Sequence, residues 1–130
     1  MDIESDTIIL RNGKITVAVL PAQGGKIIGM RLAGEGRNYV WFDERQAAKY
    51  DPAAEYDPQF SGGIEELLPS DVPETIDGIL YPDHGELWRV PLAIEYADCS
   101  NAILSAELPQ TGFSYRREMA LDGNSLVCKT

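Results

Sequence analysis

The side chains best suited to proton transfer lie in one short segment, residues 81–88, which reads Tyr-Pro-Asp-His-Gly-Glu-Leu-Trp. His84 is the single histidine of the chain, and the carboxylates of Asp83 and Glu86 are close to it in sequence. Nearby carboxylates favour the protonated imidazole and make it a better proton donor near neutral pH. A positioned imidazole can give or take a proton while bonds rearrange. His84 is therefore a candidate catalytic residue, and the alternative is an ordinary turn flanked by solvated acids.

Three more side chains are candidates for contacting a ligand. Glu65 and Glu66 follow Gly62-Gly63, and adjacent residues on a strand point to opposite faces. One of these carboxylates can then face inward and accept hydrogen bonds from the hydroxyl groups of a neutral ligand. The alternative is a pair of solvated acids on an edge strand. Trp88 is expected to pack in the core, with stacking against a ligand ring as the alternative.

The segments that must position these residues have the pattern of short β-strands. Asn12-Gly13 separates two β-favouring runs and predicts a hairpin, because both central residues of a type I′ turn need positive φ. Pro21 ends the second run, since it has no N–H for a ladder. Short strands bounded by turn residues favour an all-β sandwich or barrel. The expected strands cover residues 7–10, 14–20, 26–32, 38–42, 64–68, 90–96, 102–108, 113–121 and 125–130.

Two segments depart from this pattern. Residues 43–61 are expected to form a long irregular excursion, with one or two helical turns within residues 44–50. Asp51-Pro52 and Asp57-Pro58 break any longer helix. Residues 70–77 are expected to be irregular as well. Loops as long as the excursion are usually functional or mobile, so it is interpreted as a flap over one end of the sheet.

Composition narrows the choice of partners and compartment. The chain has 130 residues, which suits one domain, and its 21 acidic and 11 basic residues give a net charge of −10. Such a surface repels phosphate backbones and anionic lipids, so no nucleic-acid or membrane partner is expected. No apolar run reaches the roughly 20 residues of a membrane helix, and no signal peptide is visible. Two cysteines cannot build a disulfide framework, which favours the cytoplasm. A single histidine rules out a His-rich metal site.

Three motifs occur in an order that is similar to the galactose mutarotase-like (aldose 1-epimerase) superfamily. They are Gly24-Gly25-Lys26-Ile27-Ile28, the segment 62–69, and Pro82-Asp83-His84-Gly85-Glu86-Leu87-Trp88. The antiparallel strands that follow, with residues 121–127, also resemble that superfamily. The resemblance spans essentially all 130 residues but only the front half of a typical member. It implies a galactose mutarotase-like antiparallel β-sandwich, of which residues 1–130 form a single, incomplete β domain.

The resemblance also implies a function. Aldose epimerases interconvert sugar anomers by acid–base ring opening and need no cofactor, because only protons move. His84 matches the first histidine of the family pattern, which makes it the expected catalytic acid. Members bind a small-molecule sugar, so sugar contacts are expected from Glu65, Glu66, Asp83, Glu86 and Trp88, with no metal. The chain has no second histidine and no glutamate after Glu118, so the isolated chain is expected to lack the general base and to be inactive or weakly active.

Two alternatives remain open at this level. One is a non-catalytic carbohydrate-binding module, and the other is a structural β domain in which the His-Gly turn is incidental. The last expected strand, residues 125–130, begins after a clear turn, and the sequence ends there. The chain is therefore interpreted as the front part of a larger β-sandwich. Homo-oligomerisation through this unfinished strand edge is the alternative, because unpaired edges readily pair with another copy.

Overall fold

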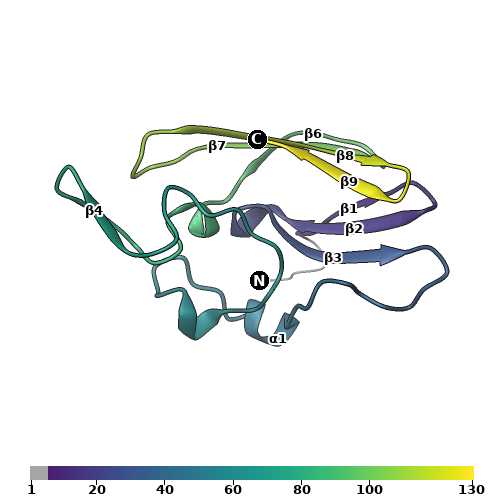
Figure 1. The fold of residues 1–130 in the computed structure, drawn as a ribbon, viewed down its shortest axis with the longest axis horizontal. Helices are drawn as coiled ribbons and strands as arrows, with labels where there is room; N and C mark the ends of the chain where they lie inside the picture. Colours follow the sequence, from purple (N-terminus) through teal and green to yellow (C-terminus); the bar gives the residue numbers. More distant parts are fainter. Residues whose placement is uncertain (1–5) are drawn as a thin grey trace.

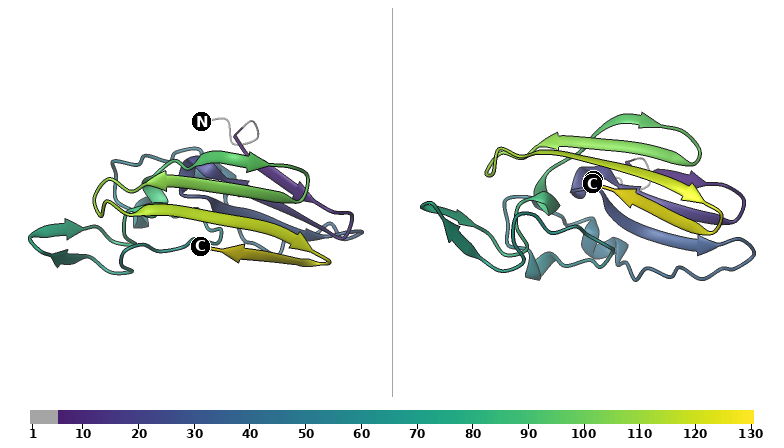
Figure 2. Two further views of the ribbon diagram at one scale, coloured as in Figure 1. Left: turned by 90° about the horizontal axis from the view of Figure 1, so that it is seen from above. Right: turned by 45° about the horizontal axis from the view of Figure 1, so that its top comes forward.

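The computed structural model describes residues 6–130 and consists mainly of two antiparallel sheets that face each other (Figure 1). The first sheet has the order β1-β2-β3, with β1 at Ile8–Arg11, β2 at Ile15–Leu20 and β3 at Lys26–Leu32. The second has the order β6-β7-β8-β9. Its strands are β6 (Ala93–Ala97), β7 (Asn101–Glu107), β8 (Ser114–Asp122) and β9 (Ser125–Lys129). The views from above and from the tilted side show one layer over the other (Figure 2).

The core lies between the two sheets, where alternate residues of each strand point inward. On β2 the inward positions are Ile15, Val17 and Val19, and on β7 they include Leu104, all at most 4% exposed. Burying these aliphatic side chains supplies the main stabilisation of the two layers. The chain therefore folds as the expected antiparallel sandwich. The core is made by Leu10, Ile15, Val17, Val19, Ile27, Leu87, Val90, Leu92, Ala102, Leu104, Leu108, Tyr115 and Met119.

A buried arginine joins the two sheets where β3 begins. Arg117 on β8 points inward and is 2% exposed. Its Nη1 donates to the carbonyl oxygen of Gly25 at 2.6 Å, and its Nε donates to the Tyr115 hydroxyl at 2.7 Å. A buried guanidinium needs such partners, because an unpaired one would lose its hydration without compensation. These bonds hold the start of β3 against β8.

Several strands expected from the sequence take another form. Residues 38–42 run as irregular backbone, because the Asn38 side chain replaces a strand at the edge of β3. Its Oδ1 accepts from the Met30 N–H at 2.9 Å, and its Nδ2 donates to the Ile28 carbonyl at 3.1 Å. Residues 64–68 form only isolated bridges, Ile27 with Ile64 and Leu68 with Gly85. The prediction of strands at these two segments was wrong, since local β propensity does not supply a pairing partner.

Residues 70–77, expected to be irregular, contain β4 (Glu74–Ile76). It pairs with β5 (Ile79–Tyr81) in a hairpin that projects to one side of the molecule (Figure 1). Asp77 and Gly78 at the turn have φ of +50° and +78°, as a type I′ turn requires. This Asp-Gly signal was present in the sequence.

The excursion, residues 43–61, contains two short helices joined by irregular backbone. α1 (Glu44–Ala47) begins at Asp43, whose carboxylate accepts hydrogen bonds from the backbone N–H groups of Arg45 and Gln46. A 3-10 turn, η2, covers Asp57–Gln59. Two further 3-10 turns, η1 (Pro21–Gln23) and η3 (Leu87–Arg89), lie where the sheets meet the irregular segments. Within residues 6–130, no helix is long and apolar enough to cross a membrane.

Candidate functional site

The His84-Gly85 turn is held by its backbone against residues 68–71. The N–H of His84 donates to the Asp71 carbonyl at 2.8 Å, and the N–H of Glu86 donates to the Leu68 carbonyl at 2.7 Å. His84 has φ of +64° and Gly85 has φ of +71°. A Cβ added at Gly85 would overlap the Leu68 carbonyl oxygen, so this close approach requires glycine. Positive φ at a histidine is uncommon and is maintained only where the surroundings enforce it.

The imidazole of His84 is held on two sides and open on part of its surface. Its Nδ1 lies 2.9 Å from Oδ2 of Asp83, close enough for a hydrogen bond. The ring stacks on the phenol of Tyr56, with 3.8 Å between centroids and 16° between planes. The His84 side chain is 26% exposed. The imidazole is therefore oriented and remains accessible, which is what a proton-transfer group needs.

Tyr56 comes from the excursion and is fixed by a buried polar chain. The Tyr56 hydroxyl donates to Oε2 of Glu65, and Oε1 of Glu65 lies 3.2 Å from Nζ of Lys26. Lys26 also donates to the Ser61 hydroxyl at 2.9 Å. The Lys26 and Glu65 side chains are 6% and 10% exposed. Burial, together with the hydrogen bond to Glu65, raises the pKa of Tyr56 above its usual range, so the phenol stays protonated. These polar contacts connect the excursion to Lys26 at the start of β3.

A hollow of about 350 Å³ is lined by two residues that contact His84, although His84 itself is not part of its wall. It lies between the excursion and the base of the β4–β5 hairpin, and Tyr56 and Asp83, both in contact with His84, form part of its wall. We call it the acidic hollow, because three of its lining side chains are carboxylates. Its lining residues are Ala53, Ala54, Glu55, Tyr56, Asp57, Pro73, Leu80, Pro82, Asp83 and Arg89.

Three side chains that could bind a cation or accept hydrogen bonds lie close together, and two of them, Asp57 and Asp83, line the acidic hollow. One donor atom each from Asp57, Asp83 and His84 lies within 4.8 Å of the other two. Carboxylate oxygens and an imidazole nitrogen are ligands for divalent cations, and they also accept hydrogen bonds from hydroxyl or ammonium groups. The arrangement can therefore receive a polar ligand rich in donors.

The other candidates from the sequence divide into two groups. Glu65 is joined to His84 through Tyr56, and Trp88 lies edge-on to Tyr56 at 5.3 Å. Trp88 is 3% exposed and its Nε1–H donates to the Gly85 carbonyl at 3.0 Å, so it packs behind the turn.

Glu66 and Glu86 have partners elsewhere. Glu66 accepts a hydrogen bond from the Tyr115 hydroxyl at 2.7 Å, on the side of β8. Glu86 is fully buried and accepts from the backbone N–H groups of Gln110 and Thr111, at 3.2 and 2.9 Å. Glu65 and Glu66 do point in different directions, although they lie on irregular backbone and not on the expected strand.

Tyr56, Asp57 and Lys26 were missed by reasoning from the sequence. Tyr56 and Asp57 belong to the excursion, where no periodicity shows which side chains turn inward. Lys26 lies in the Gly-Gly-Lys motif, but a lysine is normally exposed and nothing local predicts that it is 5% exposed here. The excursion also contains Tyr50 and Phe60, so the aromatic ring of Tyr56 did not by itself single this residue out.

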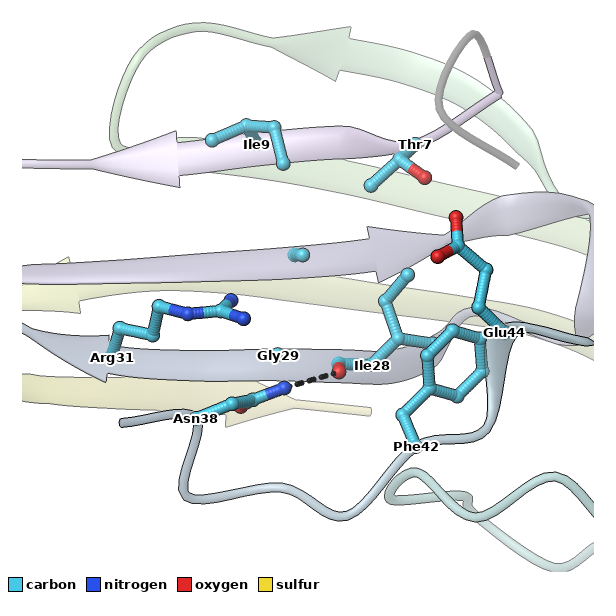
Figure 3. Close-up of a pocket in the computed structure, with 9 residues that line it drawn as sticks. Thr7, Ile9, Ile28, Gly29, Arg31, Asn38, Phe42 and Glu44 are labelled. Atoms are coloured by element: carbon cyan, nitrogen blue, oxygen red, sulfur yellow. Dashed lines mark hydrogen bonds between the residues drawn. The ribbon is translucent and has the colours of Figure 1, made fainter. Parts of the chain in front are cut away.

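A second hollow, of about 380 Å³, lies on the outer face of the β1–β2–β3 sheet (Figure 3). Its floor includes Ile9, Ile28 and Phe42, and the Arg31 and Glu44 side chains lie toward opposite ends (Figure 3). None of the residues expected to do chemistry lines it. The acidic hollow, whose wall includes the two residues that contact His84, is therefore the candidate site.

The two facing antiparallel sheets, with the His-Gly turn at one end, define a β-sandwich of the galactose mutarotase-like fold. Two solved structures share this fold. The Slr1438 protein from Synechocystis sp. PCC 6803 has a TM-score of 0.67 and 19% identity, covering 92% of this chain and 45% of that one. A galactose mutarotase related enzyme from Lactobacillus acidophilus has a TM-score of 0.66 and 16% identity, covering 92% of this chain and 40% of that one.

The comparisons confirm the expected fold class and the expected resemblance at the level of the fold. The chain spans less than half the length of either structural neighbour. No protein-family model matches the chain, and no curated protein matches its sequence.

Proposed function

We propose that this protein binds a monosaccharide in the acidic hollow and takes part in aldose 1-epimerase-type chemistry, the interconversion of sugar anomers. The observation that carries the proposal is the geometry of His84. Its imidazole is partly exposed and is oriented by Asp83 and Tyr56, which both line a hollow of about 350 Å³. Pockets that bind small molecules begin at roughly 300 Å³. The fold shared with a galactose mutarotase related enzyme supports the choice of a sugar.

The proposed step needs one acid and one base. Protonated His84 donates its proton to the ring oxygen of the sugar while a carboxylate removes the proton of the anomeric hydroxyl. The bond between C1 and the ring oxygen breaks, which leaves an open-chain aldehyde. Rotation about the C1–C2 bond and ring closure, with both protons returned, give the other anomer. The contact with Asp83 keeps the imidazole ring oriented. The resemblance assigns the base to the later half of a full-length member, so His84 is the only catalytic residue that we assign.

The direct test uses His84 as its own probe. Because the chain contains a single histidine, its imidazole signals in an NMR spectrum need no assignment by mutation. Titration with glucose and with galactose is expected to shift these signals in a saturable way. Glu66→Gln is the control variant. Glu66 contacts Tyr115 and not His84, so this variant should show the same sugar-dependent shifts as the wild type. Imidazole signals that do not shift with either sugar would refute binding at this site.

Catalysis is tested separately by polarimetry of freshly dissolved aldoses. In the full-length protein, His84→Asn is expected to lower the rate of anomerisation by about 10²- to 10⁴-fold, the usual contribution of a positioned acid–base group. An unchanged rate would remove His84 from the mechanism.

A non-catalytic carbohydrate-binding protein is the second candidate function. It requires only the hollow and its polar lining, with no second acid–base group. It predicts saturable sugar binding with no change in the rate of anomerisation. Polarimetry of the wild-type protein, at a concentration where NMR shows the sugar bound, distinguishes the two functions.

We further propose a cytoplasmic location and self-association through β9. Cys99 and Cys128 are free and exposed thiols, which suits a reducing compartment.

β9 is an edge strand of its sheet, and an edge strand presents unpaired backbone groups to another chain. Analytical ultracentrifugation is expected to show a dimer that Val127→Pro weakens.

A further inference from the structure

The acidic hollow has a charge that bears on which sugars it accepts. Glu55, Asp57 and Asp83 contribute three carboxylates to its wall, and Arg89 contributes one guanidinium. The Arg89 guanidinium lies 4.8 Å from the centre of the Trp88 ring, so part of its surface is occupied by the indole. Among the lining side chains, three negative groups against one positive group leave an excess of two negative charges, and a protonated His84 beside Asp83 reduces this excess to one.

The carboxylates of Glu55 and Asp57 have no ion-pair partner among residues 6–130. The nearby ammonium group of Lys26 is already engaged by Glu65 on the buried side of Tyr56. Asp83 is hydrogen-bonded to His84, and the Asp57 donor atom is within 4.8 Å of both. A ligand in the hollow therefore meets uncompensated negative charge next to the imidazole.

Resting on the proposed function, we propose that the site selects sugars that carry an ammonium group, the amino-deoxyhexose class, and rejects phosphorylated sugars and uronates. An ammonium group supplies three donors and a positive charge to Asp57, Asp83 and Glu55. A phosphate or carboxylate in the same place would face like charges, and such repulsion is an effective source of specificity. A neutral hexose can bind through its hydroxyl groups but gains nothing from the charge.

Asp57, Asp83 and His84 could also bind a divalent cation, and this is the competing use of the cluster. A metal ion needs several ligands at fixed short distances, whereas an ammonium group tolerates a looser arrangement. The His84 nitrogen that faces Asp83 is already hydrogen-bonded at 2.9 Å. These features favour the ammonium group, and the experiment includes a direct test for the metal.

The experiment follows the His84 imidazole signals during titration with four compounds at pH about 6, where a primary amine is protonated. Glucosamine is compared with glucose, N-acetylglucosamine and glucose 6-phosphate, all in the presence of a chelator. Glucosamine is expected to bind about tenfold more tightly than glucose or N-acetylglucosamine, and glucose 6-phosphate at least about tenfold more weakly. Raising the salt concentration from about 0.01 M to about 1 M shortens the Debye length from about 30 Å to about 3 Å and should remove most of the preference.

Matched variants place the effect at the hollow. Asp57→Asn is expected to reduce the preference for glucosamine over glucose to about threefold. Glu44→Gln changes the net charge equally but lies at the second hollow, so the preference should remain at about tenfold. Asp57 is exposed, and its side chain makes no ion pair in the described chain, so Asp57→Asn is expected to fold normally.

The possible outcomes distinguish a failure of the charge selectivity from a failure of the proposed sugar binding. Equal binding of all four compounds, or tighter binding of glucose 6-phosphate, overturns the charge selectivity and leaves sugar binding intact. If none of the four shifts His84, sugar binding and the selectivity are both overturned. If no sugar binds but Mn²⁺ without chelator broadens the His84 signals at micromolar concentration, the cluster is a metal site and the selectivity is again overturned.

Discussion

The phenol ring of Tyr56 lies face to face with the imidazole of His84, with 3.8 Å between the ring centroids. These residues come from segments that are 28 positions apart in sequence, the excursion and the His-Gly turn. The contact fixes one face of the imidazole, while Asp83 fixes its Nδ1 edge. Tyr56 is itself held by Glu65, so the orientation of His84 depends on a polar chain that begins at Lys26.

Two substitutions at Tyr56 separate its ring from its hydroxyl. Tyr56→Phe keeps the stacked ring and removes the hydrogen bond to buried Glu65, so the free energy of unfolding should fall by about 1.5–3 kcal/mol. The His84 ring-proton shifts should stay close to those of the wild type. Tyr56→Leu removes the ring, so these shifts should move downfield as the ring current disappears. NMR and urea denaturation measure both effects, and equal His84 shifts in the two variants would contradict the stacking.

The buried pair of Lys26 and Glu65 should behave differently from an exposed ion pair. Lys26→Met leaves the Glu65 carboxylate buried without its cation, and losing one partner of a buried pair costs about 3–5 kcal/mol. The double variant Lys26→Met, Glu65→Leu removes both charges and should recover a large part of that loss. Arg116→Met is the matched control, because Arg116 pairs with Glu95 at an exposed site and should have a much smaller effect. Additive losses in the double variant would argue against the pairing.

Gly85 is predicted to be the least replaceable glycine of the site. Gly85→Ala combines a left-handed φ of +71° with overlap of the new Cβ on the Leu68 carbonyl oxygen, so the loss should be about 3 kcal/mol or more. Gly34 has φ of +78° but open space around it, so Gly34→Ala should lose only about 1–2 kcal/mol. Thermal and urea denaturation compare the two variants, and similar losses would mean that the turn can move away from residues 68–69.

Stability should decline at alkaline pH through the buried tyrosines. Burial, with the hydrogen bond to Glu66, raises the pKa of Tyr115 to about 12, and burial raises that of Tyr50 to about 12, from an ordinary value near 10. Above pH 10 the unfolded chain loses these protons first and binds fewer than the folded chain, so the free energy of unfolding falls as pH rises toward 12. Tyr115→Phe should make this fall shallower. Urea denaturation between pH 8 and 11.5 checks the slope, and an unchanged slope in the variant would contradict this assignment.

Much of the fold was predictable because its signals are local. Asn12-Gly13 predicts the β1–β2 hairpin, and alternation along residues 113–121 predicts that Met119 and Arg117 share the inner face of β8. His84 was identifiable from the sequence as the candidate for acid–base chemistry, being the single histidine in a Pro- and Gly-bounded turn, and its role stays a prediction. The strands expected at residues 38–42 and 64–68 did not form, because the Asn38 amide takes the β3 backbone groups of Ile28 and Met30, and residues 64–68 form only isolated bridges.

The sequence by itself determined the all-β class, the turns between strands and the residue types available for acid–base chemistry. Only the tertiary structure decided that Tyr56 lies on His84, that Glu65 turns to a buried Lys26, and that Glu66 and Glu86 bind elsewhere. Strand periodicity and turn chemistry depend on neighbours within a few residues, so they can be read along the chain. Contacts across an irregular loop depend on how the whole chain closes around its core, and no short stretch of sequence encodes that closure.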